Sequence, residues 1–175
     1  MFKKGLLVLL ALFMLVFLFA GCTSKNGGDT SLEGTWRVTE QCWVDEEDGE
    51  IVDEGSETYP AEDEEEDCLI QPYFQLKNNV FKSFSKHIYE EGSIVFLFGE
   101  GTYEVEGNTF TVTFEFEEEE EDISEYTYVI SGNKISISSE DVDEYGKYSA
   151  TMKAVKVSDS EVAGAIPWDF FEFEE

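Results

Sequence analysis

An internal repeat of 12 residues is the feature that most constrains the fold. The segment 102–113, TYEVEGNTFTVT, recurs 25 residues later at 127–138 as TYVISGNKISIS. Each copy reads as two short strands joined at Gly-Asn, a pair that tolerates the positive φ angles of a two-residue hairpin turn. With the first turn at Gly107-Asn108, Val105 is expected to face Phe110 across the hairpin. Two stacked hairpins predict an antiparallel meander.

The same turns predict which side chains point inward. Each hairpin places apolar side chains on one face and mostly polar ones on the other, as a curved sheet with one buried side requires. The inward set comprises Tyr103, Phe110, Val112, Tyr128 and Ile137, with Phe96, Phe98 and Phe114 expected beside it. Side chains fill a small barrel more often than they leave a cavity. We therefore interpret this set first as core and second as the lining of a pocket.

Alternation of apolar and polar residues continues outside the repeat, and no segment after residue 31 sustains a long helical period. Further strands are predicted at 35–44, 69–77, 80–89, 94–98 and 145–157. The segment 80–89 is ambiguous, because its apolar residues also fit a helical stripe. The predicted class is all-β: an antiparallel up-and-down meander that closes into a barrel of eight or nine strands. A two-sheet β-sandwich is the alternative.

Residues 1–21 read as an export signal that precedes the domain. A positive start is followed by an uncharged apolar stretch from Leu6 to Ala20, and then by Gly21-Cys22. This pattern resembles the signal peptide of bacterial lipoproteins, and the stretch falls slightly short of the ~20 apolar residues of a membrane span. Cys22 is the predicted lipid attachment point, and 22–31 a polar tether. The alternative is an ordinary secretory signal or an uncleaved membrane helix.

The charge of the chain excludes several classes of partner. The chain has 40 Asp and Glu against 11 Lys and Arg, a formal charge of −29. Removing residues 1–21, which hold two lysines and no acid, makes the charge −31. So negative a domain repels phosphate backbones, which argues against nucleic acid as a partner. An aromatic content of 15% distinguishes the chain from a disordered acidic tail.

Three acidic runs stand out, at 45–50, 62–67 and 117–122. We expect them to form solvated loops outside the strands. Carboxylates clustered in a loop can hold Ca²⁺, but none of these runs has the alternating carboxylate spacing of a calcium loop. The sequence therefore predicts no metal site.

The remaining reactive side chains give little sign of chemistry. Cys42 and Cys68 follow Cys22, and export favours pairing, so a Cys42–Cys68 disulfide is predicted, with two free thiols as the alternative. His87 is the single histidine; no pattern supplies an acid to orient it, and it is expected at the surface or at a rim. The chain has no Gly-rich phosphate loop, no Cys-x-x-Cys pair and no Gly-x-Ser-x-Gly elbow. We predict no catalytic residue and no cofactor.

The segment Leu-x-Gly-x-Trp at 32–36 resembles the start of lipocalins. Its position after a lipoprotein signal, together with the repeated Gly-Asn hairpins, makes residues 32–157 similar to the lipocalin-like domain of bacterial envelope lipoproteins. The resemblance implies that Gly34 and Trp36 form the motif that closes the barrel. In lipocalins an arginine of the last strand covers this tryptophan, whereas the last strand here offers lysines.

The resemblance also implies a function. It predicts a non-catalytic binding domain on a lipid-anchored protein of the bacterial cell envelope, most simply at the outer membrane, on its periplasmic or surface face. A ligand in the barrel mouth would be a small apolar molecule. The alternative is a structural or protein-interaction module with a filled barrel, whose partner is an envelope protein or a glycan. Residues 158–175 are expected to pack on the barrel as an acidic, aromatic tail, with a partner-binding tail as the alternative.

Overall fold

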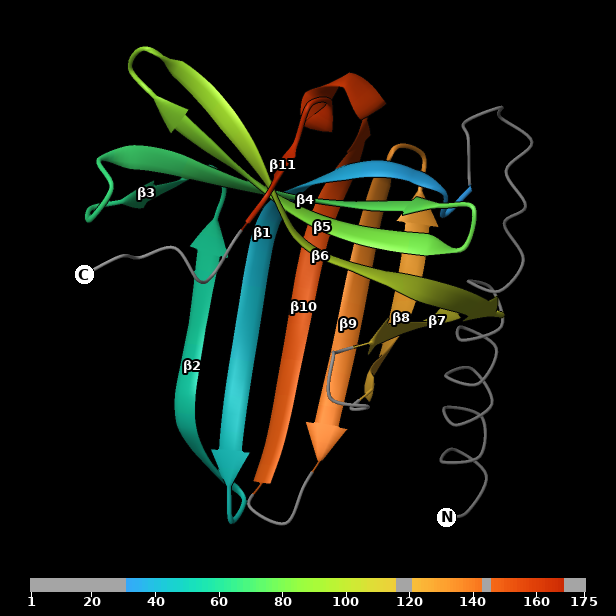
Figure 1. The fold of residues 1–175 in the computed structure, drawn as a ribbon. Coiled ribbons are helices and arrows are strands. Elements are labelled where there is room, and N and C mark those ends of the chain that lie inside the picture. The colour runs from blue at the N-terminus through green and yellow to red at the C-terminus, as the bar shows by residue number, and fades with distance from the viewer. Residues whose placement is uncertain (1–30, 116–120, 143–145, 169–175) are drawn as a thin grey trace, which may run out of the picture.

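The computed structural model describes residues 31–115, 121–142 and 146–168 (Figure 1). The strands are β1 (Gly34–Glu47), β2 (Glu50–Thr58), β3 (Ala61–Asp63), β4 (Cys68–Lys77), β5 (Val80–Tyr89), β6 (Gly92–Glu106), β7 (Thr109–Glu115), β8 (Glu121–Ser131), β9 (Lys134–Val142), β10 (Gly146–Val157) and β11 (Ile166–Pro167). The short 3₁₀ helix η1 spans Asp159–Val162. The all-β prediction is confirmed. Within the described ranges, no helix has the length and hydropathy of a membrane span.

Eight of these strands close into one antiparallel barrel. Each strand from β4 to β9 pairs with the next strand in sequence, and β1 pairs with both β10 and β4 to complete the ring. This is the predicted up-and-down meander, and the sandwich alternative is not observed. The strands β2 and β3 extend the sheet beyond the barrel, because β2 pairs with β1 and β3 pairs with β4.

Both Gly-Asn hairpins have the predicted register. Val105 pairs with Phe110 in the first, and Ile130 pairs with Ile135 in the second. The glycine that begins each turn has a positive φ, 64° in one hairpin and 63° in the other. A residue with a Cβ adopts that conformation only at a cost in strain. The turn chemistry therefore sets the register, as the repeat indicated.

The structure settles the ambiguous segment 80–89 and changes the bounds of one predicted strand. The ambiguous segment 80–89 is strand β5, which pairs along its length with β4 and β6. Pairing on both edges overrides a local pattern that also fits a helix. The predicted strand 94–98 is not separate, because it forms part of the 15-residue strand β6. Strands β2 and β3 were not predicted, since their acidic sequences show little apolar alternation.

The acidic runs are not confined to loops, which corrects the expectation from sequence. In the first run, residues 45–47 belong to β1 and Glu50 begins β2, so the run surrounds a hairpin turn. In the second, Glu62 and Asp63 belong to β3. Most of the third run lies outside the described residues. Carboxylates are tolerated on β2 because nearly all of its residues are exposed to water.

The main core lies at one end of the barrel, around Trp36. Trp36, Leu76 and Val112 are completely buried, and Phe110 is 2% exposed. The rings of Trp36 and Phe74 stack with their centroids 6.2 Å apart. The buried members of this cluster are Leu32, Trp36, Val38, Phe74, Leu76, Tyr103, Phe110, Val112, Ile135, Ile137 and Ala154. We call this region the packed end.

A smaller cluster lies on the outer face of β4 and β5. Successive side chains of a strand point to opposite faces, so Tyr73 and Phe84 lie outside the barrel, where Val162 of η1 packs on them. The chain then continues to β11, which pairs in parallel with β6 beside Phe96. The strand β7 pairs with β6 only from Thr102 onward. The short strand β11 thus covers part of an edge of β6 that β7 leaves open.

Candidate functional site

Along β5, the side chains that face the barrel interior change from large to small. Its inward-facing residues are, in order, Phe81, Ser83, Ser85 and His87, and their partners on β4 are Leu76, Phe74, Pro72 and Ile70. Leu76 belongs to the core of the packed end, and Phe81 packs against that core. The two serines beyond it are too short to fill the space between opposite walls. The barrel is therefore filled at one end and hollow at the other, which we call the open end.

The hollow at the open end is a pocket of about 560 Å³, a size typical of small-molecule sites. Most of its wall is apolar or aromatic and comes from β1, β4, β5, β6 and β10, and from the residue that follows β11. These lining residues are Val38, Ile70, Pro72, Phe74, Phe81, Phe98, Met152 and Trp168; Tyr73 and Phe84, whose side chains pack on the outer face, border the pocket as well. The polar lining residues are Asp63, Glu66, Ser83, Ser85 and His87.

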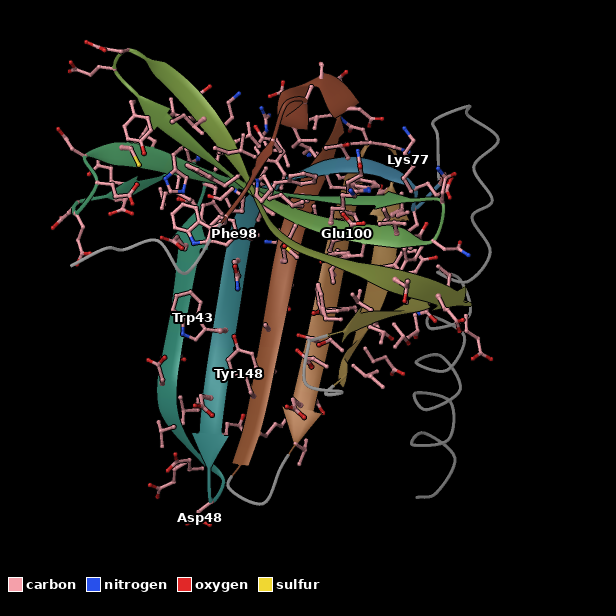
Figure 2. The ribbon with its side chains drawn as sticks, viewed as in Figure 1. Trp43, Asp48, Lys77, Phe98, Glu100 and Tyr148 are labelled. Carbon is pink, nitrogen blue, oxygen red and sulfur yellow. The ribbon has the colours of Figure 1, made fainter. Side chains whose placement is uncertain are left out.

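Trp168 forms one side of this pocket. Its indole stacks on Phe98 with ring centroids 4.9 Å apart and meets Phe96 edge-on at 4.7 Å. The ring of His87 lies 5.8 Å from it. The backbone N–H of Trp168 donates to the carbonyl of Leu97 at 3.0 Å, which fixes the indole against β6. The segment after β10 thus supplies part of the pocket wall, close to where Figure 2 labels Phe98.

Ser85 lines the pocket and carries a polar atom that is not hydrogen-bonded within the described part of the chain. Its hydroxyl oxygen is buried and has no hydrogen-bond partner among the described residues. A buried polar group without a partner costs about 1 to 3 kcal/mol. If the Ser85 side chain turns toward the pocket, a hydrogen bond from a ligand would remove this cost and would orient the ligand.

His87 is buried, which corrects the expectation of a surface or rim position. The residue is 4% exposed, and its Nδ1 lies 3.0 Å from a carboxylate oxygen of Glu66. The hydroxyl of Tyr89 donates to the same oxygen at 3.2 Å. Sequence reasoning missed this orienting acid because Glu66 lies 21 positions away, inside an acidic run in which no carboxylate is distinguished from its neighbours.

The predicted disulfide between Cys42 and Cys68 is absent, and both thiols are free. Cys42 lies in the middle of β1, where its partners are Ser56 of β2 and Thr151 of β10. Cys68 begins β4 and pairs with Asp63 of β3. The strand registers therefore place the two thiols in different surroundings, which their spacing in the sequence does not reveal.

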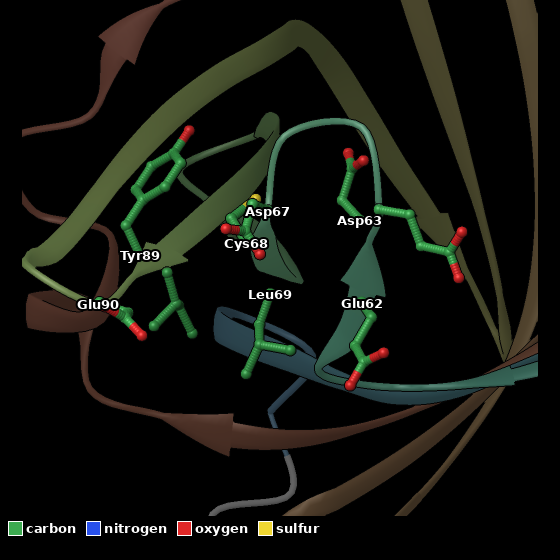
Figure 3. Close-up of a pocket in the computed structure, with 9 residues that line it drawn as sticks. Glu62, Asp63, Asp67, Cys68, Leu69, Tyr89 and Glu90 are labelled. Carbon is green, nitrogen blue, oxygen red and sulfur yellow. The ribbon is translucent and has the colours of Figure 1, made fainter.

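Cys68 is buried at an acidic end of the sheet (Figure 3). A second pocket of about 540 Å³ there is lined by Glu62, Asp63, Glu64, Asp67, Cys68, Leu69, Ile88, Tyr89 and Glu90. Burial raises the pKa of the Cys68 thiol, and the negative charges of Asp63 and Glu66 raise it further. The thiol therefore keeps its proton at neutral pH unless a cation replaces it.

The motif predicted to close the barrel lies at the packed end. The indole N–H of Trp36 donates to the carbonyl of Leu32 at 2.9 Å. The ammonium of Lys156, on the last barrel strand, lies 5.5 Å from the centroid of the Trp36 ring, a cation–π contact. Gly34 has a φ of 138°, and a Cβ there would lie 2.5 Å from the Lys156 side chain. A lysine thus covers the tryptophan where the resemblance implied an arginine.

The inward set predicted from the hairpins belongs to the packed end. Tyr103, Phe110, Val112 and Ile137 are buried in the main core, and Tyr128 packs against it. None of the five lines the 560 Å³ pocket. Of the further aromatics expected inside, Phe98 lines that pocket and Phe114 packs against the main core. Cys22, the predicted lipidation site, lies outside the described residues, as does the chain after Trp168.

The family model of a lipocalin-like domain matches residues 32–137. The match runs from the turn before β1 into β9 and so includes both Gly-Asn hairpins. No curated protein matches the chain significantly.

Proposed function

Since the chain belongs to the family of lipocalin-like domains, typically binding folds without catalysis, we propose that its barrel binds a small apolar molecule. The observation that carries the proposal is the 560 Å³ pocket at the open end, whose wall is mostly apolar and aromatic. Burying an apolar ligand there gains about 25 cal/mol for each Å² removed from water. A barrel packed at both ends would offer no such gain.

The polar lining restricts the chemistry of the ligand. Asp63 and Glu66 border the pocket, and the whole chain carries a formal charge of −29. Both features repel an anion. The Ser85 hydroxyl, which has no partner in the part of the chain that the structure describes, would suit one hydrogen-bonding group in an otherwise apolar molecule. The proposed ligand is therefore not an anion, and it carries one polar group on an apolar body.

We propose further that Cys22 carries a lipid that anchors the domain in the bacterial cell envelope, at the outer membrane. The support is the sequence pattern, a positive start and an apolar stretch that ends in Gly21-Cys22. Residues 22–31 are polar and would act as a tether between the lipid and the barrel.

Titration with a neutral, environment-sensitive dye such as Nile red tests the pocket. The variant Ser85→Phe fills the space and should weaken dye binding by at least about tenfold, the loss expected when about 1.4 kcal/mol of burial is removed. Ser93→Phe is the matched control, because Ser93 is exposed on β6 and does not line the pocket. It should bind the dye as the wild type does.

Equal dye binding by Ser85→Phe and wild type would contradict the pocket proposal. That result would favour the alternative of a structural or protein-interaction module that engages an envelope protein or a glycan through its outer surface. Far-ultraviolet circular dichroism of both variants checks that the barrel is intact.

Metabolic labelling with a fatty-acid analogue tests the anchor. The wild type should incorporate the label and sediment with membranes, whereas Cys22→Ala should do neither. Incorporation that persists in Cys22→Ala would contradict lipid attachment at this residue, and Cys42→Ala serves as the control cysteine.

A further inference from the structure

We propose that Glu66, Cys68 and His87 form a binding site for a divalent transition metal, with Zn²⁺ the best match. One ligand atom from each, a carboxylate oxygen, the thiol sulfur and a ring nitrogen, lies within 4.8 Å of the other two. The sequence predicted no metal site, because the three residues stand in a turn and two different strands and follow no ligand spacing.

The geometry needs only a small closing movement. Zinc bonds of about 2.0 to 2.3 Å place two ligand atoms of a tetrahedron about 3.5 Å apart. The nitrogen of His87 and the oxygen of Glu66 are already 3.0 Å apart. The remaining separations, at most 4.8 Å, must shrink by about 1 Å as the ion draws the three groups together.

The donor set selects the kind of metal. Thiolate and imidazole are ligands that Zn²⁺ and similar ions prefer, whereas Ca²⁺ and Mg²⁺ prefer oxygen alone. Two of the three ligands, Cys68 and His87, are buried, so an ion held there would be shielded from water on the side of the sheet. Three protein ligands leave a fourth position for water.

The surroundings attract a cation. Asp63, Glu66 and Asp67 all place negative charge near the Cys68 sulfur. The acidic pocket of Figure 3 leads to this sulfur, and its acidic lining would concentrate cations near the site. On binding, the Cys68 thiol releases one proton to solvent and the sulfur coordinates the ion as a thiolate. His87 binds the ion as a neutral ring through the Nδ1 that faces Glu66, so the Nδ1 proton is lost to solvent while Nε2 takes one up, and the net release on binding is the one thiol proton.

Local structure holds the ligands in place. The carboxylate of Asp63 accepts hydrogen bonds from the backbone N–H groups of Glu65 and Glu66, at 2.9 and 3.2 Å, which shapes the turn that carries Glu66. The Tyr89 hydroxyl donates to the Glu66 carboxylate at 3.2 Å. The ring of Phe96 meets His87 edge-on with centroids 4.9 Å apart, which limits the orientation of the imidazole. Such partners outside the ligand set orient metal ligands in proteins.

Calorimetric titration of the full-length protein with ZnCl₂, under a reducing agent that does not bind metals, tests the proposal. Wild type should bind one equivalent, and CaCl₂ should not compete. Loss of a residue that only orients a metal ligand weakens metal binding by about 10- to 100-fold. Cys68→Ser and His87→Gln each remove a ligand and should weaken zinc binding by more than this. Tyr89→Phe removes only the hydroxyl that orients Glu66 and should weaken binding by about 10-fold. Cys42→Ser is the matched control and should bind as wild type does.

Two spectroscopic measurements keep the test decisive if a buried variant fails to fold. Co²⁺ added to wild type and to Cys42→Ser should produce a thiolate-to-cobalt charge-transfer band. X-ray absorption of the zinc-loaded Cys42→Ser protein should show one sulfur in the first shell. The proposal would be overturned by a zinc shell of nitrogen and oxygen alone or by the absence of zinc binding. Equal binding by Cys68→Ser would also overturn it, because it would show that the acidic runs bind the ion without the thiol. Because zinc and dye titrations are separate measurements, neither result decides the other.

Discussion

The two ends of the barrel are built from the same strands but differ in what their side chains do. At the packed end, β4 and β5 meet through Leu76 and Phe81, and Trp36 is completely buried. At the open end the same two strands meet through Pro72 and Ser85, and a pocket of about 560 Å³ remains. The backbone pairing is continuous between the two. Side-chain size along one strand therefore decides where this barrel is solid and where it is hollow.

The comparison also separates stability from function. A filled interior gains dispersion contacts and removes apolar area from water, so it stabilises the fold. A hollow interior lacks those contacts, and here the Ser85 hydroxyl has no partner within the described ranges. We expect substitutions at the packed end to cost free energy of unfolding, and substitutions at the open end to change binding more than stability.

The largest expected effect is that of Trp36→Ala. Removing a fully buried indole from the packed end should lower the free energy of unfolding by about 3 to 5 kcal/mol. The matched control is Trp43→Ala, seven residues further along the same strand and labelled in Figure 2, where the indole donates to Asp53 at 3.0 Å and is partly exposed. It should cost about 1 kcal/mol. Urea unfolding measures both, and equal losses would show that the packed end is no more essential than the ribbon of β1 and β2.

The next effect has the opposite sign. Ser85→Ala removes a buried hydroxyl that has no partner among residues 31–115, 121–142 and 146–168, and it should raise the free energy of unfolding by about 1 kcal/mol in the absence of ligand. Ser138→Ala is the control, because the Ser138 hydroxyl lies 3.4 Å from that of Thr151 and its removal should cost about 0.5 kcal/mol. A loss of stability in Ser85→Ala would mean that the hydroxyl has a partner and that the open end is more tightly packed than we infer.

The smallest effect concerns the attachment of the C-terminal segment to the packed end. The carboxylate of Asp159 accepts hydrogen bonds from Lys77 and Thr35, both at 2.8 Å, and these hold the pKa of Asp159 below its ordinary range. A lowered folded pKa contributes stability above the ordinary aspartate pKa, and this is lost as the pH falls through the lowered value. The carboxylate is about half exposed, so we expect at most about 0.5 kcal/mol.

Asp159→Asn should therefore lose less stability than wild type between about pH 7 and about pH 3, as measured by urea midpoints at the two pH values. Asp48→Asn, at the exposed tip of the β1–β2 hairpin in Figure 2, is the control and should follow wild type. An unchanged pH profile in Asp159→Asn would indicate that the two hydrogen bonds add nothing to stability in solution.

Local chemistry explains what could be predicted of the fold. The Gly-Asn turns specified both hairpin registers, because a two-residue turn leaves one pairing that keeps the apolar face together. The segment 80–89 could not be decided, since its pattern suits a strand or a helix and only its neighbours β4 and β6 select the strand. The strand β2 escaped detection because a ribbon exposed on both faces needs no apolar alternation.

Much less of the candidate sites could be predicted from the sequence. His87 and Glu66 are brought together by pairing between β4 and β5, and Trp168 reaches the pocket only because β11 joins the edge of β6. Cys68 was expected to pair with Cys42, yet register places it beside Glu66 and His87. Each of these contacts depends on which strand edges meet, and spacing along the chain does not record that.

The sequence by itself determined the all-β class, the meander and the identity of the core aromatics, because alternation and turn residues act over a few positions. Only the tertiary structure decided where the barrel stays hollow and which polar groups converge there. Those outcomes depend on strand pairing between distant segments and on side-chain volume summed across the barrel. Nothing in the sequence distinguishes the serines of β5 from other serines. They line a pocket only because the fold places Pro72 and Phe98 around the same space.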